Sequence, residues 1–157
     1  MAALDTVFGG FRVRAQQTYA LLQAPGTAFL VVAAPEPDAL REAAYFVERL
    51  GEERMPLAGL VVNRASRAPQ GTLSADEAMA ASARLRRDPK ASETATLTSG
   101  LLRLHADRAR MVEREAALRQ RFAAGHPNVP TAVVAALAGD VHDLDGLRVV
   151  GDLLAGT

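Results

Sequence analysis

The chain has no cysteine, which excludes disulfide bonds, thiol catalysis and cysteine-ligated zinc. It also has no net charge, because 18 Lys and Arg residues balance 18 Asp and Glu residues, so a basic surface for nucleic acid is not indicated. No apolar run approaches the roughly 20 residues of a membrane helix. Met1–Gln23 lacks the basic and then apolar plan of a signal peptide. We therefore expect a soluble, cytoplasmic protein that does not bind nucleic acid.

Groupings that carry catalysis are missing as well. The sequence holds no Gly-x-x-x-x-Gly-Lys-Ser/Thr loop, the arrangement that surrounds nucleotide phosphates. His105, His126 and His142 are scattered without metal-ligand spacing, and no Ser-His-Asp grouping can be ordered from them. We assign no catalytic residue and no metal ligand, and no cofactor is certain for the chain alone.

What is present is enough for one domain with a core of its own. The chain has 157 residues, of which 49% are hydrophobic and 23% charged. We expect a single α/β domain over residues 1–157, with a helical insertion at about 66–125.

Two short apolar runs, Thr27–Ala34 and Leu57–Asn63, suit parallel strands that are buried on both faces. Between them apolar residues recur at helical spacing over 40–50, and Pro37 suits a first helical turn. The stretch therefore predicts a βαβ unit, and Thr131–Ala136 predicts a third buried strand. We expect a three-layer fold, with these strands parallel in chain order, the first at the sheet edge, and helices on both faces.

The helical insertion contains two predicted helices. A capping box at Ser74 and Glu77 starts the first, whose apolar face is mostly alanine and which ends near Arg87. The second, over residues 95–124, carries a narrow apolar stripe that Arg108 and Glu115 interrupt. We expect a helical cover for the sheet with these two charges at its wet edge; the alternative is a surface for a partner or client.

Amphipathic helices are also predicted near both ends of the sequence. Residues 4–23 have apolar side chains at steps of three or four. Asp143 is expected to cap a last helix. The side chains expected to face inward from that helix are Leu144, Leu147, Val150 and Leu154.

Polar side chains follow the first two strands. Glu36 comes after the first, while Asn63 and Arg64 close the second. Because ligands of parallel sheets gather beyond the carboxyl ends of the strands, these residues are candidates for one binding rim. From the residues alone, Glu36 is equally a carboxylate near a helix start, Asn63 a side chain that satisfies a turn, and Arg64 a side chain in solvent.

The order of these features resembles the arsenical-pump and tail-anchored-protein-targeting ATPases, also called anion-transporting ATPases. The features are an apolar strand, a Glu at its end, a long helix and a strand that ends on Asn. A second match is Leu137–Leu154, which resembles the family's adenine loop and closing helix. The resemblance covers roughly the C-terminal half of a typical member and implies part of a P-loop NTPase-type domain. It implies that Asn63 reads adenine and that Glu36 approaches the nucleotide near a dimer interface. The nucleotide-binding residues implied are Asn63, Glu36, Arg64, Leu137, Asp140 and Val141.

The resemblance further implies ATP and magnesium in a complete assembly, and a homo- or heterodimer. The implied partners are a P-loop-containing half or a homologous ATPase subunit, with a protein client or a membrane partner in addition. The family's P-loop and catalytic aspartates have no counterpart here, so ATP hydrolysis by this chain alone is not expected. The alternative function is a non-catalytic interaction module that uses the helical insertion, and a third is an independent small α/β enzyme, for which no catalytic grouping is found.

Overall fold

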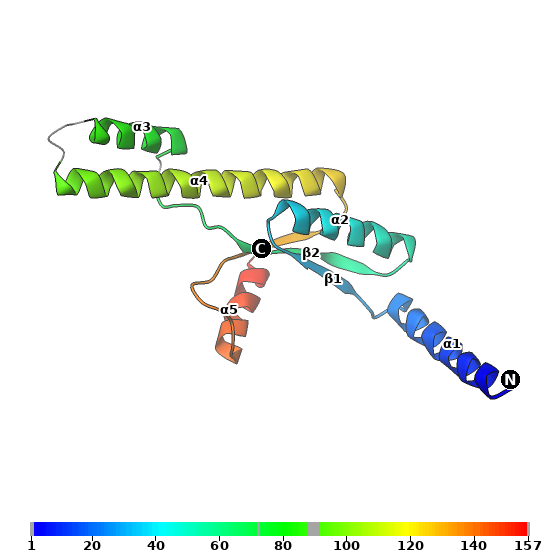
Figure 1. The fold of residues 1–157 in the computed structure, drawn as a ribbon. Coiled ribbons are helices and arrows are strands. Elements are labelled where there is room, and N and C mark those ends of the chain that lie inside the picture. The colour runs from blue at the N-terminus through cyan, green and yellow to red at the C-terminus, as the bar shows by residue number, and fades with distance from the viewer. Residues whose placement is uncertain (1, 72, 88–91, 157) are drawn as a thin grey trace.

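The computed structural model describes residues 2–71, 73–87 and 92–156 (Figure 1). Within these ranges the side chains are described from Phe11 onward. Its elements are α1 (Ala2–Gln23), β1 (Phe29–Ala33), α2 (Pro37–Glu52), β2 (Leu57–Ala65), α3 (Ala75–Arg86), α4 (Glu93–Gly125), β3 (Thr131–Ala135) and α5 (Leu144–Ala155). The predicted strands and helices are all present. β2 is longer than expected, because it continues past Asn63 to Ala65.

The three strands pair in parallel in the order β1-β2-β3, as predicted, so β1 is an edge of the described sheet. Close approach at the start of β2 requires a residue without a side chain. A Cβ atom at Gly59 would lie 2.6 Å from the carbonyl oxygen of Pro130, which accepts a hydrogen bond from Leu60 N at 2.8 Å. Gly59 thus lets β2 and β3 meet where β3 begins.

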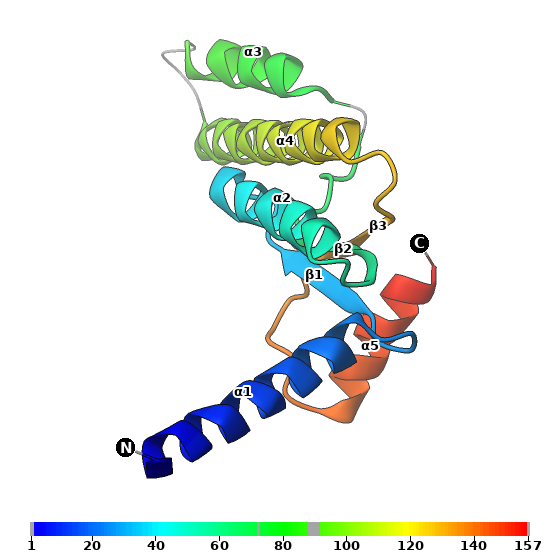
Figure 2. The same ribbon diagram turned by 90° about the vertical axis from the view of Figure 1, so that its right-hand side faces the viewer.

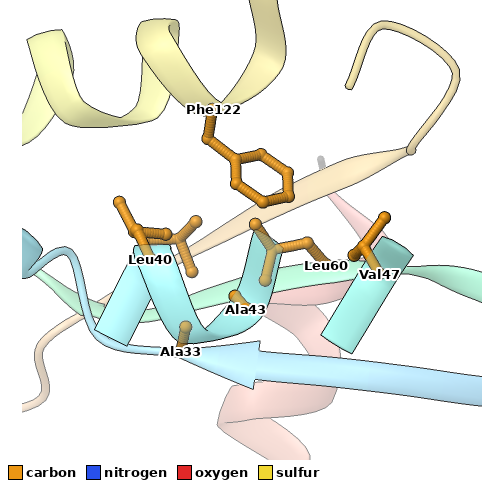
Figure 3. Close-up of a cluster of buried hydrophobic side chains, with 7 residues drawn as sticks. Ala33, Leu40, Ala43, Val47, Leu60 and Phe122 are labelled. Atoms are coloured by element: carbon orange, nitrogen blue, oxygen red, sulfur yellow. The ribbon is translucent and has the colours of Figure 1, made fainter. Parts of the chain in front are cut away.

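One face of the sheet carries the main core, which α2 and the last turns of α4 cover (Figure 3). Leu60 and Val62 of β2 are almost fully buried, and Phe122 of α4 is 6% exposed. The buried cluster consists of Ala33, Leu40, Ala43, Val47, Leu60, Val62 and Phe122. The helical spacing of the α2 residues produces the inward stripe that the sequence predicted.

The opposite face is covered only in part, by α5, which packs mainly on β3. Val134 of β3 is buried, but Leu30 and Val32 of β1 are 55% and 58% exposed. Helices therefore lie on both faces, as predicted, but the expectation that the first strand is buried on both faces is wrong, because α5 leaves the β1 side of the second face open. The expected inward face of α5 is wrong at its start: Leu144 and Leu147 are 69% and 58% exposed, because α5 packs mainly on β3 and the rest of this face is open.

In the helical insertion, α3 lies along the first half of α4 (Figures 1 and 2). Ala78 and Ala106 are fully buried between them, and Ser82 Oγ donates a 3.0 Å hydrogen bond to Ser99 O. The capping box is confirmed, since Ser74 Oγ accepts from Glu77 N and the Glu77 carboxylate accepts from Ser74 N. Small side chains let the two helices approach closely, so the alanine-rich face of α3 is buried.

Only the end of α4 covers the sheet. Leu118 and Phe122 reach the core, while the earlier part of the predicted apolar stripe extends beyond it. Leu97, Leu101 and Leu104 are about two thirds exposed (65%, 66% and 66%). The expectation of a helical cover is therefore met by the last turns alone.

Helix α1 projects away from the sheet in both views (Figures 1 and 2). It is attached near its end, where Gln23 Nε2 donates to Glu53 O at 2.6 Å. A hydrogen bond to the Glu53 carboxylate raises the pKa of the Tyr19 phenol above its usual value. Within the described residues, no helix combines the length and the apolar character needed to cross a bilayer.

Candidate functional site

The carboxyl ends of β1 and β2 lie side by side. Ala33, the last residue of β1, is in register with Val62, which directly precedes Asn63. Asn63 and Glu36 therefore both follow paired residues at the same edge of the sheet. Glu36 is exposed at the N-cap of α2 and its side chain makes no capping hydrogen bond.

A β-bulge shapes the end of β2. Between two paired positions β2 advances three residues, from Val62 to Ala65, while β3 advances only from Val133 to Ala135. The additional residue falls at Asn63–Arg64, and Arg64 has a left-handed φ of 61°. Bulges bend a strand and redirect side chains, and they are frequent beside functional sites.

The Asn63 side chain is oriented by the bulge itself. Its Oδ1 accepts a hydrogen bond from Arg64 N at 2.9 Å. One lone pair of Oδ1 is thereby used, which leaves the second lone pair and both N–H groups of the amide for a ligand. The sequence interpretation that Asn63 satisfies a turn is thus correct in part, and the amide keeps most of its hydrogen-bonding capacity.

A cavity of about 410 Å³ opens beside this bulge, between the partly covered face of the sheet, the 137–141 loop and α5. This volume lies in the range of roughly 300 to 1,000 Å³ common for small-molecule sites. Its walls are mainly aliphatic, from Leu30, Val32, Val61, Val134, Leu137, Val141, Leu147, Val150 and Leu154. Its polar lining comes from Asn63, Arg64 and Asp140.

The loop and α5 close the cavity through the start of that helix. Asp143 is the N-cap, as predicted, and its Oδ1 accepts from Gly146 N at 2.7 Å. A Cβ atom on Gly146 would lie 3.0 Å from Val141 Cγ1, so glycine allows the first turn of α5 to pack against the loop. Asp143 and Gly146 thereby fix the wall that carries Val141.

The structure brings together five of the six residues implied by the family resemblance. Asn63, Arg64, Leu137, Asp140 and Val141 all line the cavity. Glu36 is not among the lining residues and stands at the same edge of the sheet, exposed to solvent.

Sequence reasoning missed the sheet floor of the cavity and its support. Leu30 and Val32 alternate with residues of the main core, and this period of two was the signal that could have assigned them to the second face. Glu115 was expected at a wet edge, and this is wrong: it is half-buried and accepts two hydrogen bonds from Ser66. No sequence signal joins residues so far apart.

The lining of the cavity suits a small molecule that is mostly apolar. A flat, mostly apolar group can lie between the aliphatic walls, and the Asn63 amide can donate and accept hydrogen bonds at the polar end. Over the described residues, no group of three or more His, Asp or Glu side chains could hold a metal ion. A comparison with models of protein families and a search of the curated proteins both give no match for this chain.

Proposed function

We propose that this chain supplies the adenine side of an ATP site in an anion-transporting-type ATPase assembly, with a P-loop NTPase type of fold. The observation that carries the proposal is the aliphatic cavity with the Asn63 amide at its polar end. An amide presents a donor and an acceptor side by side, which matches the edge of adenine. Phosphate and magnesium contacts would come from a P-loop that the sequence does not contain.

The open side of the sheet supports a partner that carries this P-loop. Among the described residues β1 has a neighbour on one side only, and an unpaired strand edge is a template for another strand. Leu30 and Val32 are more than half exposed on the cavity face of that same strand. A P-loop-containing half or a homologous subunit that paired with β1 would cover both features.

An NMR titration of the chain with ATP and with GTP tests the adenine assignment. Without phosphate contacts, we expect ATP to bind with a dissociation constant on the order of millimolar, about 4 kcal/mol. The shifted resonances should belong to cavity residues such as Val141. In an assembly completed by a P-loop-containing half, Asn63→Ala should weaken ATP binding by roughly 1 to 3 kcal/mol, because a buried polar partner is left unpaired, and should affect GTP less.

Asn128→Ala is the matched control, because Asn128 is an exposed asparagine outside the cavity lining. It should leave both titrations unchanged. Equal losses of ATP and GTP binding in Asn63→Ala would show that Asn63 supports the fold and does not read adenine.

A second candidate function is a non-catalytic interaction module that uses α4. It is favoured by the exposure of Leu97, Leu101 and Leu104, which follow one another at helical spacing. Changing all three to Gln would then abolish partner binding while ATP binding at the cavity persists. If partner binding survived these changes and was lost when Leu30 and Val32 were replaced by Thr, the assembly would be joined through the sheet.

A further inference from the structure

One carboxylate of α4 fastens the chain that leaves the cavity. Glu115 Oε2 accepts a hydrogen bond from Ser66 N, and Oε1 accepts one from Ser66 Oγ, both at 2.7 Å. Both donors belong to the same residue, so the two bonds fix the orientation of Ser66 as well as its position. Figure 1 shows the segment from β2 to α3, which begins at Ser66, running alongside α4.

The fastened residue follows the bulge directly. Ser66 lies two positions after Arg64. The left-handed φ of Arg64 is unfavourable for any residue other than glycine. Such a conformation persists only where the surroundings hold it from several sides. Arg64 N donates to Asn63 Oδ1, and Ala65 O accepts from Ala136 N at 2.9 Å. The hydrogen bonds from Ser66 to Glu115 restrain the chain next to Arg64 as well, and Glu115 belongs to the helical insertion rather than to the sheet.

A second contact strengthens the same attachment. Arg108 Nε donates to Arg67 O at 3.3 Å, two helical turns before Glu115 on α4. The two charged residues that interrupt the apolar stripe of α4 thus both bind the chain beyond the bulge. Arg108 is exposed, whereas the Glu115 contact is part-buried, so Glu115 is the stronger of the two restraints.

We propose that Glu115 is a positioning residue of the cavity. By holding Ser66 it keeps Asn63 and Arg64 in the bulged conformation that lines the cavity, and it links the cavity to α4. The identity of the ligand rests on the proposed function; the link itself does not. The link is reciprocal, so a ligand that stabilises the bulge also stabilises the attachment of the chain to α4.

Amide hydrogen exchange followed by NMR tests the link without any ligand. The reporters are the amides of Arg64 and Ala136, which bond to Asn63 and Ala65 and not to Glu115. In Glu115→Ala both should exchange about tenfold faster, because the bulge opens more often. Leu60 N, in the buried core, should change by less than about twofold. Glu113→Ala, an exposed glutamate of the same helix, is the control and should leave all three amides unchanged.

Two outcomes of the exchange experiment would overturn the proposal. Unchanged exchange at Arg64 and Ala136 would mean that the bulge holds itself. An equal rise at all three amides would mean that Glu115 contributes general stability and nothing specific to the cavity. Should Glu115→Ala not fold, Glu115→Gln retains one acceptor oxygen and Ser66→Ala removes only the hydroxyl donor, and the same three amides are read in these milder variants.

A titration with AMP adds the functional readout. Glu115→Ala should weaken AMP binding about fivefold, which is the lower end of the coupling commonly found between two sites. Glu113→Ala is again the control and should leave AMP binding unchanged. Unaltered AMP binding in Glu115→Ala would overturn the positioning role. If the unaltered chain does not bind AMP, the proposed function fails while the exchange rates still decide the role of Glu115.

Discussion

Replacing Phe122 by Ala is the sharpest test of how the helical insertion is attached to the sheet. Phe122 is 6% exposed and sits between α4, α2 and β2 (Figure 3). Its ring also stacks on His126, with ring centroids 4.6 Å apart. The change removes the largest side chain that α4 contributes to the core.

The loss of stability expected in Phe122→Ala follows from the burial of the ring and from the space around it. Truncating a buried Phe to Ala costs about 3 to 5 kcal/mol, and the value depends on how well the site can collapse or fill. Phe122 also borders a groove of about 310 Å³ between α2 and α4, so water can reach part of the vacated space. We therefore expect the lower end, about 3 kcal/mol, out of a total stability of about 5 to 15 kcal/mol.

Urea denaturation followed by far-UV circular dichroism measures this change. For a slope of about 2 kcal/mol/M, the midpoint should fall by about 1.5 M with the slope unchanged. Phe46→Ala is the matched control, because Phe46 is 56% exposed and its ring meets Tyr45 edge-on with ring centroids 6.0 Å apart. Its cost should stay below about 1 kcal/mol. Equal costs for the two variants would refute the idea that Phe122 anchors α4 to the sheet.

Three further outcomes are expected. In urea denaturation, Gly59→Ala should destabilise the fold by about 1 to 3 kcal/mol, since its Cβ would lie 2.6 Å from Pro130 O. Gly151→Ala, with no atom within 4 Å of the new Cβ, should be neutral or slightly stabilising in the same measurement. Hydrogen bonds from Ser74 lower the pKa of Glu77 below its usual 4.5. Because the pKa is lowered in the folded chain, the stability that this cap contributes is complete above about pH 4.5 and is lost as the pH falls further. The helicity of α3 should therefore decrease on acidification, and this decrease should be absent in Glu77→Gln. Purified chain should release no phosphate from magnesium-ATP, because nothing in the sequence forms a P-loop; turnover abolished by a point change within the chain would contradict this.

The fold was predictable where local pattern and packing agree. Runs of apolar residues and a helix with one apolar stripe are sufficient to give β1, α2 and β2 and their parallel order. The caps at Ser74 and Asp143 were predictable for the same reason, since a cap depends only on residues within one turn.

The details that shape the cavity depend on contacts across the chain and were not predictable. The bulge at Asn63–Arg64 arises where β2 pairs with β3, and the Glu115 contact joins positions 49 residues apart. Periodicity predicted an inward Leu144, which is 69% exposed in the structure. Pattern describes which side of an element is apolar, and the neighbouring elements decide whether that side is buried.

The order of the strands has a consequence for folding. Every strand pair is parallel, so each must be joined by a long crossover, and the crossover from β2 to β3 contains both α3 and α4. Closing so long a loop is entropically costly before any contact across it forms. We expect β1, α2 and β2 to form first, and β3 to join only after α4 has docked through Phe122. Until then β2 has an open edge on its β3 side, so the nascent chain has its greatest tendency to aggregate during this interval.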